Sequence, residues 1–293
     1  MKTYQQLWQS LTPLYEAGEA QAIVRTVLDV KYGMTLTDIM CGKVNELSAD
    51  ESIKLEEIVC RLQKGEPVQY VLGQANFAGR TFHVEPGVLI PRPETAELCK
   101  WIVETQKEAI KKPEETAPTI LDLCTGSGCI AITLDLDIPN SSVAGVDISE
   151  TAINIASENA KILASEAMFS TADVFDLLEG AHQEERKKLH ADIIVSNPPY
   201  ICEKESADMA KNVLDYEPDI ALFVPDANPL KFYRAIAEFA SIELRNNGLL
   251  YFEINPLYEK EMREMLEGFG FKDIETKEDS FGKKRMMRAV WQK

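Results

Sequence analysis

The sequence predicts an α/β fold: a doubly wound, mostly parallel seven-stranded sheet with an antiparallel C-terminal strand pair, preceded by a small helical-bundle domain and a β-hairpin linker. From residue 118 onward, strand-like apolar runs alternate with helical segments, which is typical of a parallel sheet. The last two runs are joined by about ten residues without a helix, too few for a parallel crossover. Residues 1–75, by contrast, show apolar positions at helical spacing.

Composition and charge narrow the class of protein. The chain has 293 residues, a formal net charge of −17, and 45% hydrophobic against 27% charged residues, which is ordinary for a globular protein and unlike a disordered chain, a collagen or a coiled coil. No apolar run reaches the roughly 18–20 residues that span a bilayer, and no signal-peptide core follows Met1. We therefore expect a cytoplasmic protein with no membrane contact. Its negative charge predicts no direct nucleic-acid partner, since phosphate contacts need Lys and Arg.

Three regions are expected along the chain. Residues 1–75 are predicted to form the helical domain, residues 76–90 a β-hairpin linker that turns near Gly79, and residues 91–293 the α/β domain. The helical domain, residues 1–75, carries no cluster of catalytic side chains. It is either a plain bundle or a module that docks a partner.

The clearest helix start in the helical domain is a capping box. Ser48 lies three residues before Glu51, the spacing at which the two side chains cap each other's backbone. An amphipathic helix over 52–64 is expected to follow.

Seven strands and five helices are predicted beyond residue 90. The strands are 119–123, 142–146, 167–171, 192–196, 249–254, 271–274 and 286–291. The helices are about 95–110, 130–136, 149–165, 230–246 and 257–268. Ligands of such sheets bind at the carboxyl ends of the strands, so the residues that follow each strand are the candidates for a site.

A glycine-rich loop follows the first of these strands. Gly126 and Gly128 allow a tight turn and a close approach of a ligand to the backbone, and the free N–H groups of the next helix start favour polar or anionic atoms. With Ala131 the loop also matches the loose dinucleotide fingerprint. Alone the signal is weak, because many α/β proteins have such a turn for packing only.

Two acidic residues follow the next two strands. Asp147 lies 19 residues after Gly128, where a carboxylate can accept both hydroxyls of a ribose. Together with the loop it favours a nucleoside-containing cofactor over a simple helix cap. Asp173 is equally suited to bonding an adenine amino group and to capping a short helix.

The stretch Asn197-Pro198-Pro199-Tyr200 is the most informative of all. It follows a buried strand, its prolines fix the backbone and donate no N–H, Asn197 offers a carbonyl acceptor, and Tyr200 offers a flat face and a hydroxyl. This combination suits a planar NH2 group whose protons are both accepted. The alternative is a strand-ending loop in which the prolines only stiffen the turn.

Cysteine and histidine usage indicates no metal site. The six cysteines form no C-x-x-C pair and the three histidines do not fall at zinc spacings. We expect the cysteines to be small buried apolar side chains in a reducing compartment.

These motifs resemble those of S-adenosylmethionine-dependent methyltransferases that modify planar nitrogens. Asp122 with the loop 124–128, Asp147 and Asn197–Tyr200 carry that resemblance, although the last motif is shared with DNA adenine and rRNA guanine methyltransferases. The stretches 66–73 and 91–95 narrow it to the glutamine N5-methyltransferases of peptide chain release factors, the HemK/PrmC family. The likeness covers nearly the whole chain.

The resemblance implies a cofactor, a substrate and residue roles. S-adenosylmethionine is the implied cofactor and peptide chain release factors are the implied partners of a monomeric enzyme. By resemblance, Cys124, Thr125, Gly126, Ser127 and Gly128 wrap the methionine part. Asp147 binds the ribose, and Asp173 and Val174 flank the adenine. Asn197, Pro198, Pro199 and Tyr200 hold the glutamine, with Asn197, Pro198 and Tyr200 catalytic and Asn197 also next to the cofactor.

Two residues depart from the family pattern. Cys124 and Asn255 stand where Gly is common. Cys fits the loop provided that φ is negative there, and Asn tolerates a left-handed backbone.

Three other functions compete with this interpretation. An N-methyltransferase of an exocyclic amino group of DNA or rRNA shares the Asn197–Tyr200 chemistry but needs a basic approach surface. A nicotinamide-dependent dehydrogenase fits the glycine loop and Asp147 but leaves Asn197–Tyr200 unexplained. A non-enzymatic binding module has no need of either element.

Overall fold

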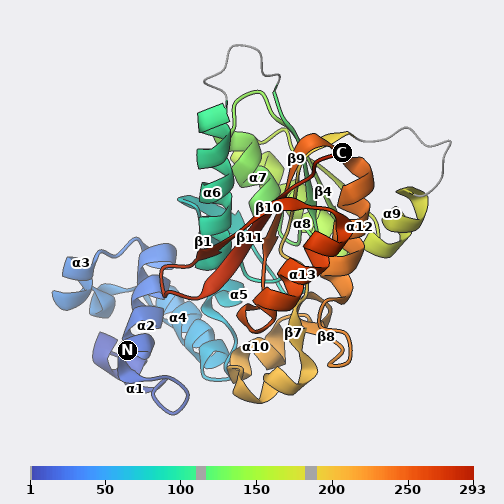
Figure 1. Ribbon diagram of the computed structural model, residues 1–293. Coiled ribbons are helices and arrows are strands. Elements are labelled where there is room, and N and C mark those ends of the chain that lie inside the picture. Colours follow the sequence, from blue (N-terminus) through green and yellow to red (C-terminus); the bar gives the residue numbers. More distant parts are fainter. Residues whose placement is uncertain (1, 110–116, 182–189) are drawn as a thin grey trace. The chain divides into compact units, whose positions relative to one another are not determined.

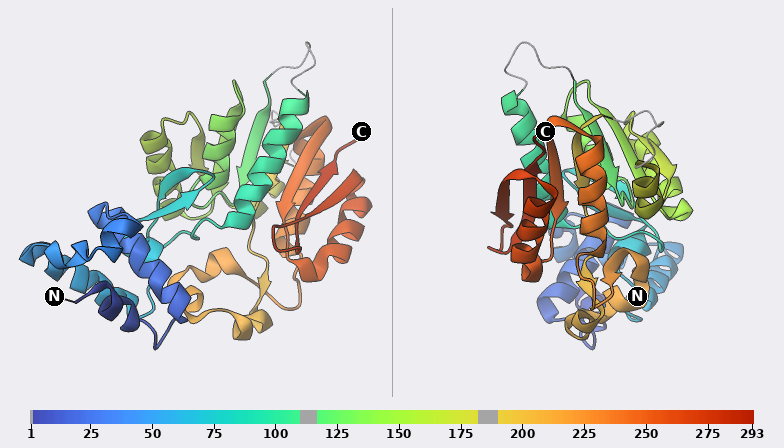
Figure 2. Two further views of the ribbon diagram at one scale, coloured as in Figure 1. Left: turned by 90° about the vertical axis from the view of Figure 1, so that its left-hand side faces the viewer. Right: turned by 45° about the vertical axis from the view of Figure 1, so that its right-hand side comes forward.

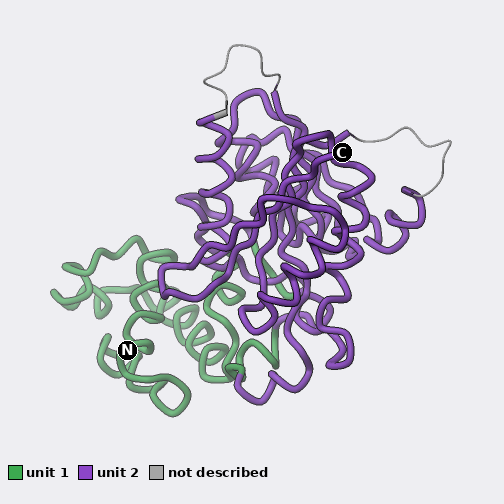
Figure 3. Tube along the Cα trace, in the orientation of Figure 1, with its two compact units in different colours: residues 1–74, 84–86, 209–216 green, residues 75–83, 87–208, 217–293 purple. Residues whose placement is uncertain are grey.

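The computed structural model describes residues 2–109, 117–181 and 190–293 (Figure 1). The chain divides into two compact units (Figure 3). The smaller comprises Met1–Gln74, Val84–Pro86 and Met209–Tyr216, and the larger comprises Ala75–His83, Gly87–Asp208 and Glu217–Lys293.

The smaller unit is helical. Its elements are α1 (Tyr4–Gln9), α2 (Ala17–Tyr32), α3 (Leu36–Met40), the 3-10 helix η1 (Lys43–Glu46), α4 (Ala49–Leu62), α5 (Val68–Leu72) and α10 (Lys211–Tyr216). The predicted capping box at the start of α4 is confirmed: Ser48 Oγ accepts from the Glu51 N–H, and Glu51 Oε2 accepts from the Ser48 N–H at 2.8 Å. Buried apolar side chains of α1, α2 and α4, among them Leu7, Leu28 and Leu62, form the core of this unit.

The β-hairpin turns where the sequence predicts. Strands β1 (Gln74–Phe77) and β2 (Arg80–His83) pair across Ala78 and Gly79, whose φ angles are both positive, as the tightest hairpin turns require. Phe77 and Phe82 meet edge to face, with ring centroids 5.8 Å apart, inside a core that they share with helix α6 (Pro93–Ala109). Residues 75–83 of the hairpin thus belong to the larger unit.

The larger unit is built on the predicted seven-stranded sheet, in the order β10-β11-β9-β6-β3-β4-β5. Its strands are β3 (Thr119–Leu123), β4 (Ser142–Asp147), β5 (Met168–Thr171), β6 (Ala191–Ser196), β9 (Leu244–Glu253), β10 (Lys272–Glu278) and β11 (Lys284–Val290). Neighbours from β5 to β9 run parallel, while β11 is antiparallel to both β9 and β10. The expected parallel sheet with an antiparallel C-terminal pair is therefore confirmed.

Helices cover both faces of this sheet (Figure 2). One layer contains α6, α7 (Cys129–Asp137) and α8 (Glu150–Leu163), and the other contains α9 (Val174–Ala181), α12 (Lys231–Glu243) and α13 (Glu259–Phe269). Successive strand residues alternate between the two cores: Ile193 and Val195 pack against the first layer and Ile194 against the second. The remaining elements are η2 (Glu203–Asp208), η3 (Pro256–Tyr258), α11 (Asp219–Leu222) and the short pair β7 (Ile201–Cys202) and β8 (Phe223–Val224).

Three boundary predictions and one burial prediction are wrong. Strand β10 runs to Glu278, beyond the predicted end at 274. Helix α12 ends at Glu243, not near 246, and β9 begins at Leu244, because Leu244 already pairs with Ala191 of β6; Arg245 adds an ion pair to Asp192 of the same strand at 2.7 Å. The sequence did not indicate this strand start, because the residues after Leu244 are polar.

Only some of the cysteines are buried. Cys41 and Cys60 of the helical unit are exposed, whereas Cys99, Cys129 and Cys202 are buried as expected. Among the described residues, no helix combines the length and apolarity needed to cross a membrane.

Gly145 of β4 should tolerate no side chain. A Cβ there would lie 2.7 Å from both Phe169 Cε1 and Thr125 Oγ1, so Gly145→Ala should lower the free energy of unfolding by about 1–3 kcal/mol through overpacking. Urea unfolding of the whole chain measures the change. The matched control is Gly18→Ala in α2, where an added Cβ meets nothing within 4 Å; there the free energy should rise by up to about 1 kcal/mol. Equal effects at the two glycines would contradict the packing argument.

Candidate functional site

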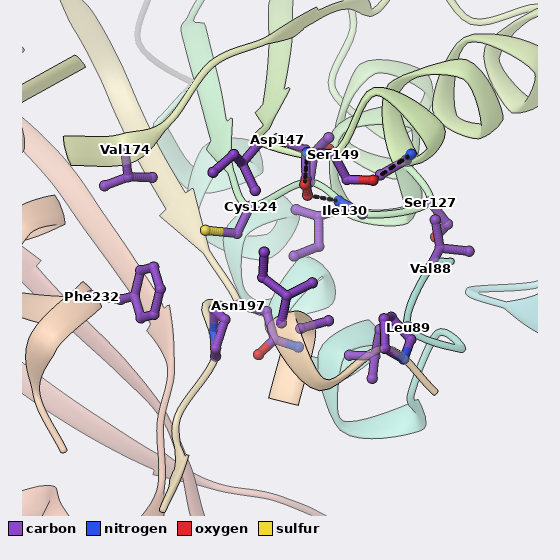
Figure 4. Close-up of a pocket in the computed structure, with 18 of the residues that line it drawn as sticks. Val88, Leu89, Cys124, Ser127, Ile130, Asp147, Ser149, Val174, Asn197 and Phe232 are labelled. Carbon is purple, nitrogen blue, oxygen red and sulfur yellow. Dashed lines mark hydrogen bonds between the residues drawn. The ribbon is translucent and has the colours of Figure 1, made fainter. Parts of the chain in front are cut away.

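A cavity of about 400 Å³ opens at the carboxyl ends of β3, β4 and β6, entirely within the larger unit. Figure 4 shows Val174 and Phe232 on one side of it, Val88 and Leu89 on the other, and Cys124 and Asn197 between them. The segment 218–225 and the start of α12 contribute further apolar residues. Its size and its largely apolar wall are those of a small-molecule site.

Residues 124–127 of the glycine loop line this pocket, whereas Gly128 is not among the described residues of its lining. Gly126 has a φ of 55°, and a Cβ added there would meet nothing within 4 Å, so the space over its backbone is open to a ligand. Gly128 caps α7 with a φ of 78°, and a Cβ there would come within 3.0–3.1 Å of Ala156, Ile132 and Phe169. Gly126 thus leaves room for a ligand, whereas Gly128 permits close packing.

Cys124 adopts a left-handed backbone, contrary to the expectation of a negative φ. Its φ is 61°, a conformation that costs a non-glycine residue of order 1–3 kcal/mol. The neighbouring loop imposes it, because the Thr125 N–H donates to the Val146 carbonyl at 3.0 Å and fixes the turn. Burial raises the pKa of the Cys124 thiol, which keeps it protonated beside the pocket.

Asp147 ends β4 and holds the loop in place. One carboxylate oxygen accepts from the Gly126 N–H at 2.9 Å and the other from the Ser149 N–H at 3.0 Å. Both bonds appear in the close-up of the pocket (Figure 4). Each oxygen retains a lone pair, so a ligand diol can still bind. Burial raises the pKa of Asp147, while these backbone donors oppose the rise.

Asp173 and Val174 line the pocket at the end of β5. Asp173 Oδ1 accepts from the Phe175 N–H at 2.8 Å, so the aspartate caps the start of α9. Its other oxygen forms no hydrogen bond within the described residues. Phe175 and Phe232 lie side by side here, with centroids 5.4 Å apart, and the Lys231 ammonium sits 4.8 Å from the Phe175 centroid. This end of the pocket therefore offers aromatic faces next to a carboxylate.

The residues after β6 divide between the pocket and the core. In the described part of the chain, Asn197 and Pro199 are part of the pocket lining, whereas Pro198 and Tyr200 are not. The Tyr200 hydroxyl donates to Glu253 Oε1 at 3.0 Å. Asn255 adopts an extended backbone, not a left-handed one. It ties this loop down by donating to the Tyr200 carbonyl at 3.2 Å and by capping η3.

Four polar residues to which the sequence assigned no role complete the site. Arg92 and Thr95 line the pocket, and the buried Glu217 accepts from the Ile90 N–H at 3.1 Å and from Arg92 Nη2 at 2.5 Å. The fourth is Glu253, buried at the end of β9. The sequence does contain a signal for Glu253, because it is an acidic residue at the end of an apolar strand.

Asp122 is buried beneath the loop. Its Oδ2 accepts from Thr125 Oγ1 at 2.6 Å and from the Ala131 N–H at 3.2 Å, while Oδ1 has no partner among the described residues. Burial raises its pKa from 3.8 to about 7. The carboxyl therefore takes up a proton near neutral pH.

The protonation of Asp122 should be visible in stability. Between about pH 4 and pH 7 the folded state holds a proton that the unfolded chain has lost, so the free energy of unfolding falls as the pH rises, by up to about 1.4 kcal/mol per unit. Asp122→Asn keeps the acceptor and cannot ionise. Its advantage over the wild type should thus be about 3 kcal/mol larger at pH 7.5 than at pH 4.5 in urea unfolding. Parallel pH curves for the two proteins would show that Asp122 is ionised throughout.

Two family models match parts of the chain. Residues 107–217 match the family described as methyltransferase small domain, and residues 11–73 match the PrmC N-terminal domain. In solved structures, the N-terminal domain of human METTL16 in complex with SAH aligns with a TM-score of 0.52 and 18% identity, over 78% of this chain and 82% of that one. A T. thermophilus 16S rRNA N2 G1207 methyltransferase in complex with AdoMet and guanosine aligns with a TM-score of 0.50 and 22% identity, over 75% and 50%. At these identities the likeness establishes the fold alone.

Sequence relatives are closer. A release factor glutamine methyltransferase of Bacteroides thetaiotaomicron is 46% identical over 96% of both chains. One of Flavobacterium psychrophilum is 38% identical over 99% of this chain and 98% of its own. With identity of this extent along both units, the chain belongs to the family of release factor glutamine methyltransferases.

Proposed function

We propose that this protein transfers a methyl group from S-adenosylmethionine to the side-chain amide nitrogen (N5) of a glutamine in peptide chain release factors. The observation that carries the proposal is that Asn197 and Pro199 share one pocket with the glycine loop and Asp147. A nitrogen held at Asn197 is thereby next to a site suited to a nucleoside.

The residues of the pocket fit S-adenosylmethionine. The open backbone at Gly126, the paired oxygens of Asp147 and the aromatic faces beside Asp173 offer places for an amino-acid chain, a ribose and an adenine in turn. We assign Cys124–Gly128 to the methionine part, Asp147 to the ribose, and Asp173 with Val174 to the adenine. When bound, S-adenosylmethionine supplies an electrophilic methyl group.

The residues after β6 prepare the nucleophile. An amide nitrogen is a weak nucleophile because its lone pair is delocalised into the carbonyl. We assign acceptance of one N–H to Asn197 Oδ1 and of the other to the Pro198 carbonyl, although Pro198 itself is not among the described residues that line the pocket. Two such bonds favour a pyramidal nitrogen with its lone pair free for attack. The ring of Pro199 restricts the backbone that follows Asn197. No base is needed before attack, since the product can lose its proton afterwards.

The smaller unit is proposed to dock the release factor, and residues 91–293 to carry the reaction. We further propose a monomer that works in the cytoplasm on protein and not on nucleic acid. The alternative, an N-methyltransferase of an exocyclic amino group of DNA or rRNA, has no observation in its favour, and the net charge of −17 opposes it.

The reaction is tested with labelled S-adenosylmethionine and a purified release factor. Mass spectrometry should place the label on one glutamine side chain for the wild type. Asn197→Ala should lower kcat by about 10²-fold, because the amide loses an orienting acceptor, while the Kd for S-adenosylmethionine measured by calorimetry changes by less than about twofold.

The control is Asn246→Ala, at an exposed position that does not line the pocket, and it should match the wild type. Label on a residue other than glutamine contradicts the proposed function. An Asn197→Ala enzyme with unchanged kcat contradicts only the role of Asn197.

Docking is tested on the surface of the helical unit. Leu36 and Met40 lie one turn apart on α3 and expose 56% and 72% of their surface. Met40→Asp should lower kcat/KM for the intact release factor by about tenfold, the size of an interface anchor, and leave a short glutamine peptide unaffected. Ile162→Asp, 59% exposed on α8, is the matched control in the larger unit. Equal losses on both substrates would argue against docking by this unit.

A further inference from the structure

A chain of three side chains links the core of the sheet to the pocket. Thr95 Oγ1 lies 2.6 Å from Glu253 Oε2, and Asn197 Nδ2 lies 3.1 Å from Thr95 Oγ1. Glu253 and Thr95 are only 2% and 3% exposed, while Thr95 and Asn197 also line the pocket. The three groups come from β9, from the first turn of α6 and from the loop after β6.

The protons in this chain have one consistent arrangement. An ionised carboxylate only accepts, so the single hydroxyl proton of Thr95 goes to Glu253. Thr95 Oγ1 is then left with lone pairs alone, and its next neighbour must be a donor. Of the two ends of the Asn197 amide only Nδ2 donates, so Nδ2 faces Thr95.

We propose that Thr95 and Glu253 are positioning residues that fix the orientation of the Asn197 amide, so that its oxygen and not its nitrogen meets the substrate NH2. The inference rests on the proposed function, because that NH2 belongs to the target glutamine. Within the described residues no hydrogen bond occupies Asn197 Oδ1, so this oxygen is available to the substrate. A flipped amide would set its NH2 against another NH2 and its oxygen against the lone pairs of Thr95.

Both carboxylate oxygens of Glu253 accept hydrogen bonds. Its two oxygens receive the Thr95 and Tyr200 hydroxyls separately, at 2.6 and 3.0 Å. Burial raises the pKa of Glu253, and these two donors together with the charge of Arg285 oppose the rise. Tyr200 thereby gains a role through Glu253, although its hydroxyl does not reach the pocket.

Three variants test the proposal, and a fourth serves as the control. Thr95→Val removes the hydroxyl at nearly constant shape and should lower kcat for release factor methylation by about 10–100-fold, with the Kd for S-adenosylmethionine within about twofold of the wild type. Thr95→Ser keeps the hydroxyl and should restore kcat to within about threefold. Glu253→Gln can donate as well as accept, so the direction is no longer fixed and kcat should fall about tenfold.

Thr133→Val is the matched control. Thr133 is equally buried, at 1% exposure, but its hydroxyl has no partner among the described residues. Its kcat should equal that of the wild type. Its melting temperature shows how much stability is lost when a buried threonine hydroxyl is removed, and the melting temperature of Thr95→Val is compared with it.

A second readout does not depend on activity. In protein labelled with 15N-asparagine, the Asn197 NH2 signals, identified by their loss in Asn197→Ala, should move in Thr95→Val and Glu253→Gln but not in Thr133→Val. The proposal is overturned if those signals stay unchanged in Thr95→Val, if its kcat equals that of Thr133→Val, or if Thr95→Ser loses as much as Thr95→Val. A wild type that methylates no glutamine refutes the proposed function instead, and the NMR comparison still decides the chain of hydrogen bonds.

Discussion

The register of the parallel strands is the constraint on which the site depends. Leu123 of β3 is level with Val146 of β4 and Ser196 of β6. The next residue of each strand, Cys124, Asp147 and Asn197, therefore falls in one row at the carboxyl edge of the sheet. Loops that lie far apart in the sequence thus become neighbours, and bonds such as that from the Gly126 N–H to Asp147 then join them.

The same row extends to β9 and explains why Glu253 lies near Asn197. Ser196 is level with Phe252, so Glu253 follows Phe252 just as Asn197 follows Ser196. A slip of one residue in this pairing would turn each side chain to the opposite face. The apolar alternation that buries Phe252 in one core and Tyr251 in the other therefore also fixes the position of Glu253.

The parts of the site that follow strands were predictable from the sequence, because periodicity locates strand ends and ligands bind there. The glycine loop, Asp147, Asp173 and Asn197 all reach the pocket for this reason. The backbone of Cys124 was not predictable, since it depends on a bond from Thr125 to the neighbouring strand. Side-chain direction was not predictable either.

The contact between Thr95 and Glu253 shows why the sequence does not predict where a side chain points. These residues lie 158 positions apart, and no local pattern relates the first turn of a helix to the end of a strand that forms much later in the chain. The Tyr200 hydroxyl was expected at the substrate, yet it donates a hydrogen bond to the Glu253 carboxylate. What the motif residues touch depends on partners that only the assembled sheet brings within reach.

The two buried acids of the site show what makes a carboxylate a reliable acceptor. Asp122 and Glu253 each receive a threonine hydroxyl at 2.6 Å, but Oδ1 of Asp122 has no partner in the described chain, whereas both oxygens of Glu253 have a hydroxyl donor. An unpaired oxygen in a dry site favours protonation, and a protonated carboxyl can reverse the direction of its hydrogen bond. Asp122 can tolerate protonation because the proton can reside on the unpaired Oδ1, while Oδ2 still accepts from Thr125 Oγ1 and from the Ala131 N–H of α7. Under Asn197 a reversal would turn the amide, so the fully paired acid lies where direction matters for the reaction.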